Sequence, residues 1–266
     1  MDGRRQGPMH DIDLHFVASL ARRAGEAILE IYQRDFSIQE KEDRSPLTDA
    51  DRRSNDLILS ALQEAHPDIP CLSEESKALD FSERRHWMRF WLIDPLDGTK
   101  EFIKKNGEFT VNIALIESGV PVLGVVYQPC GDVLYQADRL NGATKQIGQS
   151  APVVLPSSHI HYLERQTVRV VASRSHMSPE TEAFVEDLRR AGKTVEFTSS
   201  GSSLKICLVA EGAADVYPRF APTMEWDTAA AHAIATFAGR RVSHWTSGHP
   251  LIYNKPDLLN PWFLVD

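Results

Sequence analysis

The chain has 266 residues, a formal net charge of -8 and a pI near 5.7, with 42% apolar and 25% charged residues. This composition is ordinary for a globular protein and argues against extensive disorder, and the length allows one large domain or two closely packed lobes. The acidic balance argues against a nucleic acid polymer as partner, although one local basic pocket would still suit a phosphorylated small molecule.

Three cysteines stand far apart, at positions 71, 130 and 207, without a CxxC pair. This pattern predicts packed thiols in a reducing compartment and argues against a zinc site. No segment approaches the roughly 20 apolar residues that cross a bilayer, and no apolar segment follows the arginines at the start. The sequence therefore predicts a cytoplasmic protein, while peripheral contact with the cytoplasmic face of the inner membrane and the oligomeric state stay open.

Apolar residues recur at three- and four-residue intervals over residues 11–34 and 50–65, which predicts two amphipathic helices. Asp11 and Asp13 are expected to act as caps at the start of the first helix. The second helix is expected to stop before Pro67, because proline cannot continue a helix.

Between residues 70 and 137, short apolar runs predict strands that form extended hairpins. The runs cover residues 89–93, 109–116 and 122–127, and the expected breaks between strands are Gly119, Gly124 and Gly131.

A polar stretch from Gly148 to Ser158 is expected to connect two lobes, residues 11–156 and 157–266, with residues 1–10 as an extension. Beyond it, strands and helices alternate, which predicts a layered second half. The expected strands cover residues 168–172 and 194–197, the expected helices 179–190 and 203–210, and a last helix begins near Trp226.

The most informative segment is residues 91–102, where an apolar run ends in two carboxylates, a glycine and a hydroxyl. Pro95 fixes its own φ and biases Asp94 toward extended geometry, so Asp94 and Asp97 can converge on one point. Convergent buried carboxylates resist joint ionisation unless a cation lies between them. This segment therefore predicts a site for a hard divalent cation.

Other carboxylates occur in similar settings, and each alone could be an ordinary cap or surface acid. Taken together they predict an all-oxygen cage that would select magnesium, calcium or manganese. These acids are Glu74 and Glu75 after an apolar run, and Asp49, Asp51, Glu225 and Asp227 at helix starts.

The segment DPLDGTKEF at residues 94–102 resembles the inositol monophosphatase superfamily of magnesium-dependent, lithium-sensitive phosphatases, with Glu74-Glu75 upstream and EWDTAA at residues 225–230 downstream. Three more segments are similar to the 3'(2'),5'-bisphosphate nucleotidase branch of that superfamily: SRSH at 173–176, GSSLKICLVAEG at 201–212 and YPRF at 217–220. The resemblance covers nearly the entire chain.

The resemblance implies a layered α/β fold, the αβαβα sandwich of the inositol monophosphatase and sugar phosphatase type. It also implies hydrolysis of the 3'-phosphate of 3'-phosphoadenosine 5'-phosphate to AMP and phosphate in sulfur assimilation, with the sulfated analogue as a candidate second substrate. Inositol monophosphatase and fructose 1,6-bisphosphatase activities stay open because they use the same metal chemistry. A noncatalytic phosphonucleotide sensor is disfavoured, because a binder needs no water-activating pair.

Carried onto the matching positions, the resemblance implies two or three Mg²⁺ ions held by Glu74, Asp94, Asp97, Asp227 and the backbone carbonyl of Leu96. Asp51 and Thr99 would orient and deprotonate a water that attacks phosphorus in line, with Glu74 assisting and without a phosphoenzyme. The implied substrate contacts are Gly98, Thr99, His176, Gly201 and Lys205.

Two of these substrate contacts also have ordinary structural interpretations, which the sequence leaves open. His176 could cap the helix that begins near residue 179, and Lys205 could be a solvated helix residue. Gly98 and Thr99 lie in a turn that, if it opens a helix, directs backbone N–H groups at an anion.

Overall fold

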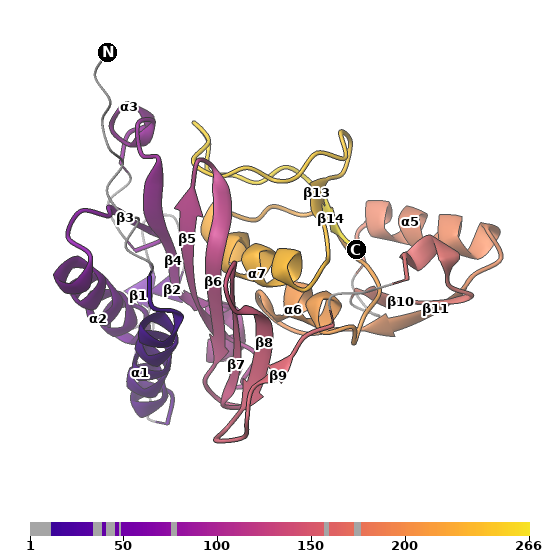
Figure 1. Cartoon of the computed structure of the whole chain (residues 1–266). Coiled ribbons are helices and arrows are strands. Elements are labelled where there is room, and N and C mark those ends of the chain that lie inside the picture. The colour runs from indigo at the N-terminus through magenta and orange to yellow at the C-terminus, as the bar shows by residue number, and fades with distance from the viewer. Residues whose placement is uncertain are drawn as a thin grey trace, which may run out of the picture.

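The structure is a computed structural model that describes residues 12–33, 39–40, 46–47, 49–75, 79–156, 160–172 and 177–266. In this part of the chain the elements stack as helices, sheet, helices, sheet and helix, so the predicted αβαβα arrangement is confirmed (Figure 1). Within the same residues, every helix is too short or too polar to span a lipid bilayer.

The first layer consists of α1 (Leu14–Tyr32) and α2 (Asp49–Ala65), close to the predicted ranges. Asp13 caps α1 as predicted, because its side chain accepts a 2.9 Å hydrogen bond from the N–H of His15. Asp11 lies outside the described residues. The apolar faces of both helices pack on one face of the central sheet and bury Trp91 and Ile93 with it.

Among the described residues, the central sheet has seven strands in the order β3-β4-β5-β6-β7-β8-β9. The first pair is parallel and the remaining pairs are antiparallel, which confirms the predicted hairpins. The strands are β3 (Cys71–Ser73), β4 (Arg89–Asp97), β5 (Thr110–Glu117), β6 (Val120–Gln128), β7 (Val133–Asp138), β8 (Gly142–Ile147) and β9 (Val153–Val154).

One sequence expectation about this sheet is wrong, and another is incomplete. Gly124 is not a break between strands, because it lies inside β6. The stretch from residue 148 to 158 contains β9, which pairs with β8, so it contributes to the sheet as well as connecting to the second half. A search for hydrophobic runs does not find β8, which is largely polar, or β9, which consists of two exposed valines.

The middle helical layer contains α6 (Leu204–Ala210) and α7 (Glu225–Phe237). Gly124 lets α7 come close to the sheet, because a Cβ at that position would lie 2.1 Å from the carbonyl oxygen of Ala230. The buried alanines of α7 present little bulk on the same side. The start of α7 is thereby held directly above the central strands.

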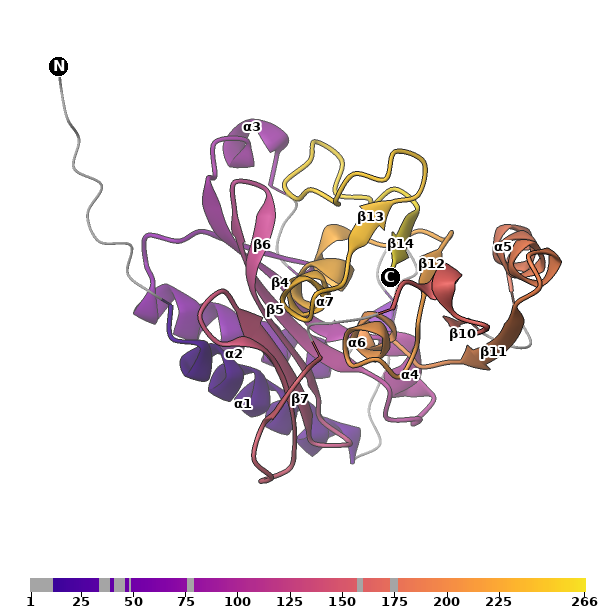
Figure 2. The same cartoon turned by 45° about the vertical axis from the view of Figure 1, so that its right-hand side comes forward.

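The second sheet layer combines parallel β10 (Thr167–Val171) and β11 (Thr194–Thr198) with antiparallel β12 (Tyr217–Arg219), β14 (Phe263–Val265) and β13 (Val242–His244). A bridge between Val170 and Val216 joins the two groups. The helix α5 (Pro179–Arg190) forms the outermost layer against β10 and β11 (Figure 2). The shorter elements are β1 (Gln39–Glu40), β2 (Pro46–Leu47), α3 (Phe81–Arg84), α4 (Thr99–Ile103) and the 3₁₀ turn at Tyr162–Glu164.

One hydrophobic cluster fills the space between the central sheet and the middle helices. It joins residues of both predicted lobes, for example Leu92 of β4 and Ile234 of α7. The lobe boundary at residues 156 and 157 remains a prediction. The three cysteines are free, but only Cys207 is fully buried, and the expectation of a packed thiol is wrong for the exposed Cys130.

Candidate metal and phosphate site

The end of β4 carries a β-bulge that determines where its two carboxylates point. Asp94 pairs with Asn112 of β5 and Asp97 pairs with Thr110, so three steps on β4 oppose two steps on β5. In a regular strand, residues three apart face opposite sides of the sheet. The extra residue brings Asp94 and Asp97 to the same side, and Leu96 packs instead into the core beneath α1 and α2.

Polar contacts hold this bulge in place. The hydroxyl of Ser54 on α2 donates a 2.8 Å hydrogen bond to the carbonyl of Pro95. The N–H of Leu96 donates to Oδ1 of Asp94 at 3.1 Å. Proline is compatible with a bulge because it has no N–H to lose from the ladder. The sequence predicted that these carboxylates converge, and the bulge supplies the mechanism.

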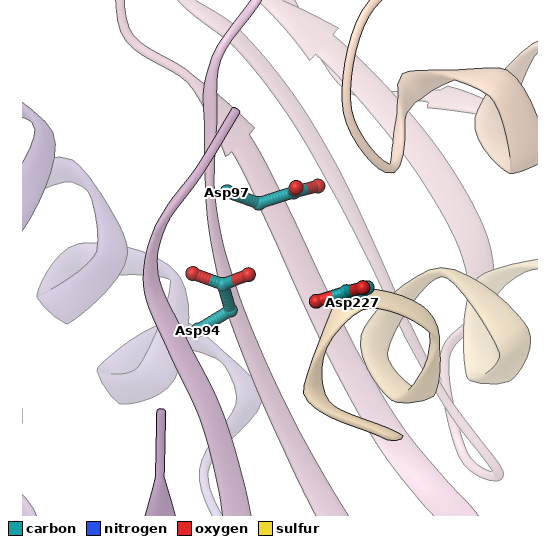
Figure 3. A group of neighbouring side chains, drawn as sticks. All are labelled: Asp94, Asp97 and Asp227. Carbon is teal, nitrogen blue, oxygen red and sulfur yellow. The ribbon is translucent and has the colours of Figure 1, made fainter. Parts of the chain in front are cut away.

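A third carboxylate comes from the opposite side of the layer interface. Asp227 lies in the first turn of α7 and accepts a 2.8 Å hydrogen bond from the N–H of Met224. One carboxylate oxygen from each of Asp94, Asp97 and Asp227 lies within 4.8 Å of the others. We call this group the Asp cluster, and its three side chains point toward one another (Figure 3).

Burial and like charge both act on Asp94, which is 1% exposed. Burial raises its pKa well above the usual range, and negative charge nearby raises it further. In decreasing order of effect, these charges belong to Glu74, Asp97, Asp227 and Asp51. Four acids on α2, β4, α7 and the turn after β3 therefore act electrostatically on Asp94.

The other members of the Asp cluster are also hard to ionise. Burial raises the pKa of Asp227 to about 8, and the charges of Asp97 and Glu74 contribute, while Arg219 acts in the opposite direction. Burial likewise raises the pKa of Asp97, against the lowering effect of Lys205. A hard divalent cation would remove this conflict, and carboxylate oxygens are the ligands it prefers. The residues present fit such a cation.

The remaining expected metal and catalytic residues lie at the starts of α2 and α4 and in the turn after β3. Asp51 is 3% exposed in the first turn of α2, and Thr99 is the first residue of α4. Glu74 is exposed and lies outside the Asp cluster, although its charge acts on Asp94 and Asp227. Its N–H donates to the carbonyl of Ile93 at 3.2 Å, which keeps it beside the end of β4.

Two of the expected substrate contacts are glycines at positions where a side chain would not fit easily. Gly98 has φ +91°, a left-handed conformation that L-residues rarely adopt, and it allows the chain to leave β4 and enter α4 within one residue. Gly201 packs against Glu108 at the start of the loop that leads to α6. His176 lies outside the described residues.

Two adjoining pockets open beside the Asp cluster. A pocket of about 80 Å³ is lined by Asp97 and Asp227, and a larger one of about 230 Å³ extends from it toward α5. Lys205, Tyr217 and Arg219 line both pockets. Lys205 and Arg219 therefore lie between the small pocket beside the acids and the larger pocket, which has room for part of an organic molecule.

Arg219 lines both pockets, but the sequence predicted no role for it. Its segment, YPRF, contributed to the resemblance, but its side chain received no role. A cation on a short strand gives no local signal of its own, since its position next to Asp227 depends on the pairing of β12 with β14. The order of the motifs along the chain was the only available indication.

Glu225 departs from its expected place. Its carboxylate is fully buried and pairs with the Nζ of Lys255 at 2.6 Å. It also accepts hydrogen bonds from the N–H groups of Asn254 at 2.6 Å and of Lys255 at 3.0 Å. Of the two acids in this segment, only Asp227 belongs to the Asp cluster, and Glu225 anchors the loop at residues 254–255.

The fold and the site together define a class: layered α/β proteins with a carboxylate centre at the junction of two sheet layers and a cationic pocket beside it. The model of the inositol monophosphatase family matches residues 12–262. The chain belongs to the inositol monophosphatase family, whose members depend on metal ions.

Similar proteins refine this assignment. The 3'(2'),5'-bisphosphate nucleotidase CysQ of Escherichia coli K12 is 46% identical over 252 residues, covering 94% of this chain and 97% of that protein. CysQ of Salmonella typhimurium is 47% identical over 255 residues, with 95% and 98% coverage. The crystal structure of CysQ from Bacteroides thetaiotaomicron has a TM-score of 0.82 at 50% identity, covering 95% of this chain and 96% of that one.

Proposed function

We propose that the chain is a magnesium-dependent 3'(2'),5'-bisphosphate nucleotidase. It removes the 3'-phosphate of 3'-phosphoadenosine 5'-phosphate to give AMP and phosphate, and it accepts the sulfated analogue as a second substrate. One observation carries this conclusion: the Asp cluster lies against a pocket whose wall contains Lys205 and Arg219. The high identity to CysQ nucleotidases over nearly the whole chain supports the same substrate class.

The Asp cluster is the proposed centre for two or three Mg²⁺ ions. Asp94, Asp97 and Asp227 would hold them, with Glu74 and the backbone carbonyl of Leu96 as further ligands. Magnesium is the cation of choice because it pairs carboxylates with phosphate oxygens. When bound, it supplies Lewis-acid chemistry, which favours ionisation of a water and neutralises charge on the phosphate.

The residues of this chain perform the other parts of the reaction. Asp51, buried at the start of α2, accepts a proton from the attacking water, which Thr99 orients at the start of α4. Glu74 assists from the exposed rim. The water attacks phosphorus directly and in line, so no side chain becomes phosphorylated.

The two pockets divide the substrate between them. The small pocket beside Asp97 and Asp227 receives the 3'-phosphate, and the larger one receives the nucleoside with its 5'-phosphate. Lys205 and Arg219 line both and can bind phosphate oxygens through charge-assisted hydrogen bonds. Gly98, Gly201 and His176 complete the proposed substrate contacts.

The assignment is tested by parallel assays of magnesium-dependent phosphate release. The substrates are 3'-phosphoadenosine 5'-phosphate, inositol 1-phosphate and fructose 1,6-bisphosphate. We expect the highest kcat/KM for the nucleotide. A higher value for either sugar phosphate would move the chain to another branch of the family, and tight nucleotide binding without phosphate release would make it a noncatalytic sensor.

A variant tests the role of Lys205. Lys205→Ala should raise the KM for the bisphosphate while changing the KM for inositol 1-phosphate much less, because only the bisphosphate offers a second phosphate. An unchanged KM for the bisphosphate would remove Lys205 from the substrate site.

The proposed place of action is the cytoplasm, where the three free cysteines would remain reduced. The proposed partner is the small nucleotide.

A further inference from the structure

A buried polar trio lies directly behind the Asp cluster and was not among the expected site residues. It consists of Thr110 and Asn112 on β5 and Ser203 at the start of α6. Their side chains are 0%, 1% and 3% exposed. Burying polar groups is costly unless they are hydrogen-bonded, so their contacts show what they do.

Two donors of this trio converge on one oxygen of Asp97. The backbone N–H of Ser203 donates to Oδ2 of Asp97 at 2.6 Å. The side-chain amide of Asn112 donates to the same oxygen at 3.4 Å. These donors limit rotation of the carboxylate and favour its ionised form, and both lower the pKa of Asp97 against the effect of burial.

The trio also determines which way the amide of Asn112 faces. Its Oδ1 accepts hydrogen bonds from the hydroxyl of Ser203 at 2.9 Å and from that of Thr110 at 3.0 Å. A flipped amide would place its oxygen against the carboxylate of Asp97 and its NH₂ group against these two hydroxyls. Because a carboxylate only accepts hydrogen bonds whereas a hydroxyl can donate or accept, Asp97 selects the orientation with Nδ2 toward it, and the two hydroxyls hold that orientation by donating to Oδ1.

The same contacts connect the Asp cluster to the pocket wall. Ser203 belongs to the loop that begins at Gly201 and leads to Lys205, whose Nζ donates to the carbonyl of Ser202 at 3.3 Å. Ser202 is in turn held by a 3.0 Å hydrogen bond from its hydroxyl to the carbonyl of Glu108. One network thus positions a carboxylate of the cluster and the start of α6, which carries the pocket cation Lys205.

We propose that Asn112 is a positioning residue that orients Asp97 for a divalent cation, with Thr110 and Ser203 fixing its amide. The inference rests on the proposed function, because it places a cation at the Asp cluster. Groups that orient metal ligands in this way typically change metal affinity or activity by about 10- to 100-fold when they are removed.

The test measures Mg²⁺ binding to the purified full chain by titration calorimetry, together with the melting temperature and the Mg²⁺ dependence of kcat. Asn112→Leu should weaken Mg²⁺ binding by about tenfold or more, and high Mg²⁺ should restore much of kcat. Thr110→Val is nearly isosteric and should show a smaller loss in the same direction. It keeps the proposal testable if Asn112→Leu does not fold.

Gln136→Leu is the matched control, because Gln136 is a buried polar residue on β7, two strands beyond β5. It can lower the melting temperature but should leave Mg²⁺ binding unchanged. Wild-type affinity in both Asn112→Leu and Thr110→Val would overturn the inference. Failure of the wild-type chain itself to bind Mg²⁺ would instead contradict the proposed function.

Discussion

Two acidic segments border the same site and direct their carboxylates differently. On β4, Asp94 and Asp97 are three residues apart, and the bulge turns both into the Asp cluster. At the start of α7, Glu225 and Asp227 are two residues apart, and only Asp227 joins it. In a helix, residues two positions apart differ by about 200° of rotation about the axis, so their side chains point in nearly opposite directions. Spacing alone therefore does not predict which acids converge.

The two segments also differ in how their charges are balanced. The like charges around Asp94 disfavour its ionisation in the protein alone. Glu225 is balanced internally by Lys255 and by two backbone N–H groups. Loss of an acid from the first segment should therefore affect catalysis, and loss of Glu225 should affect stability.

The largest expected effect is on activity. Asp94→Asn should lower kcat/KM for the bisphosphate nucleotide by about a hundredfold or more, because the bound cation supplies several kcal/mol of transition-state stabilisation. The melting temperature in EDTA should stay the same or rise, since a buried like charge is removed. Phosphate release and thermal unfolding measure the two effects. Near-normal activity would exclude Asp94 from the site.

The second segment should respond in the opposite sense. Glu225→Ala leaves Lys255 and two backbone donors without their partner, and breaking a buried ion pair costs about 3–5 kcal/mol. Urea unfolding should show this loss in the free energy of unfolding, while the folded fraction still binds Mg²⁺. Glu225→Gln should cost less because it keeps an acceptor. A large drop in Mg²⁺ affinity at unchanged stability would place Glu225 in the metal site instead.

A smaller effect tests whether the depth of α7 sets the position of Asp227. Gly124→Ala introduces a Cβ that meets the backbone of Ala230, and such overpacking costs about 1–3 kcal/mol. We expect lower stability and several-fold weaker Mg²⁺ binding as α7 moves outward. Gly131→Ala is the control, because the atoms nearest to its Cβ belong to the side chains of Gln128 and Val133 and not to the backbone. Equal Mg²⁺ affinities in both variants would show that the distance between α7 and the sheet does not affect the metal site.

A further effect concerns pH. The folded pKa of Asp227, about 8, lies above its usual value of 3.8, so the native state holds this proton more tightly than the unfolded chain. The contribution of protonated Asp227 to the free energy of unfolding is complete below pH 4 and is lost as the pH rises through about 8. The loss amounts to up to about 1.4 kcal/mol per pH unit. Melting curves in EDTA should show this slope in the wild type and a smaller slope in Asp227→Asn, in which the raised pKa values of Asp94 and Asp97 remain. Excess Mg²⁺ should flatten it.

Much of the architecture could be predicted because hydrophobic periodicity reports burial directly. The helices α1, α2 and α5 and the strands β4, β5 and β6 lie within a few residues of their predicted ranges. The strands β8 and β9 were missed because β8 is largely polar and the edge strand β9 has only two residues. Gly124 was misread because a glycine that admits a helix has the same local signature as one that ends a strand.

The sequence by itself determined the kind of chemistry at the site. Asp94, Asp97 and Asp227 occur in segments whose apolar surroundings and order along the chain indicate a cation site in the inositol monophosphatase family. Only the tertiary structure decided which acids meet. The bulge in β4, the approach of α7 over Gly124 and the pairing of β12 beside Asp227 depend on contacts between distant segments, and no local pattern encodes them. Arg219 and Asn112 take their places beside the cluster for the same reason, because a side chain acquires a partner only when the layers close.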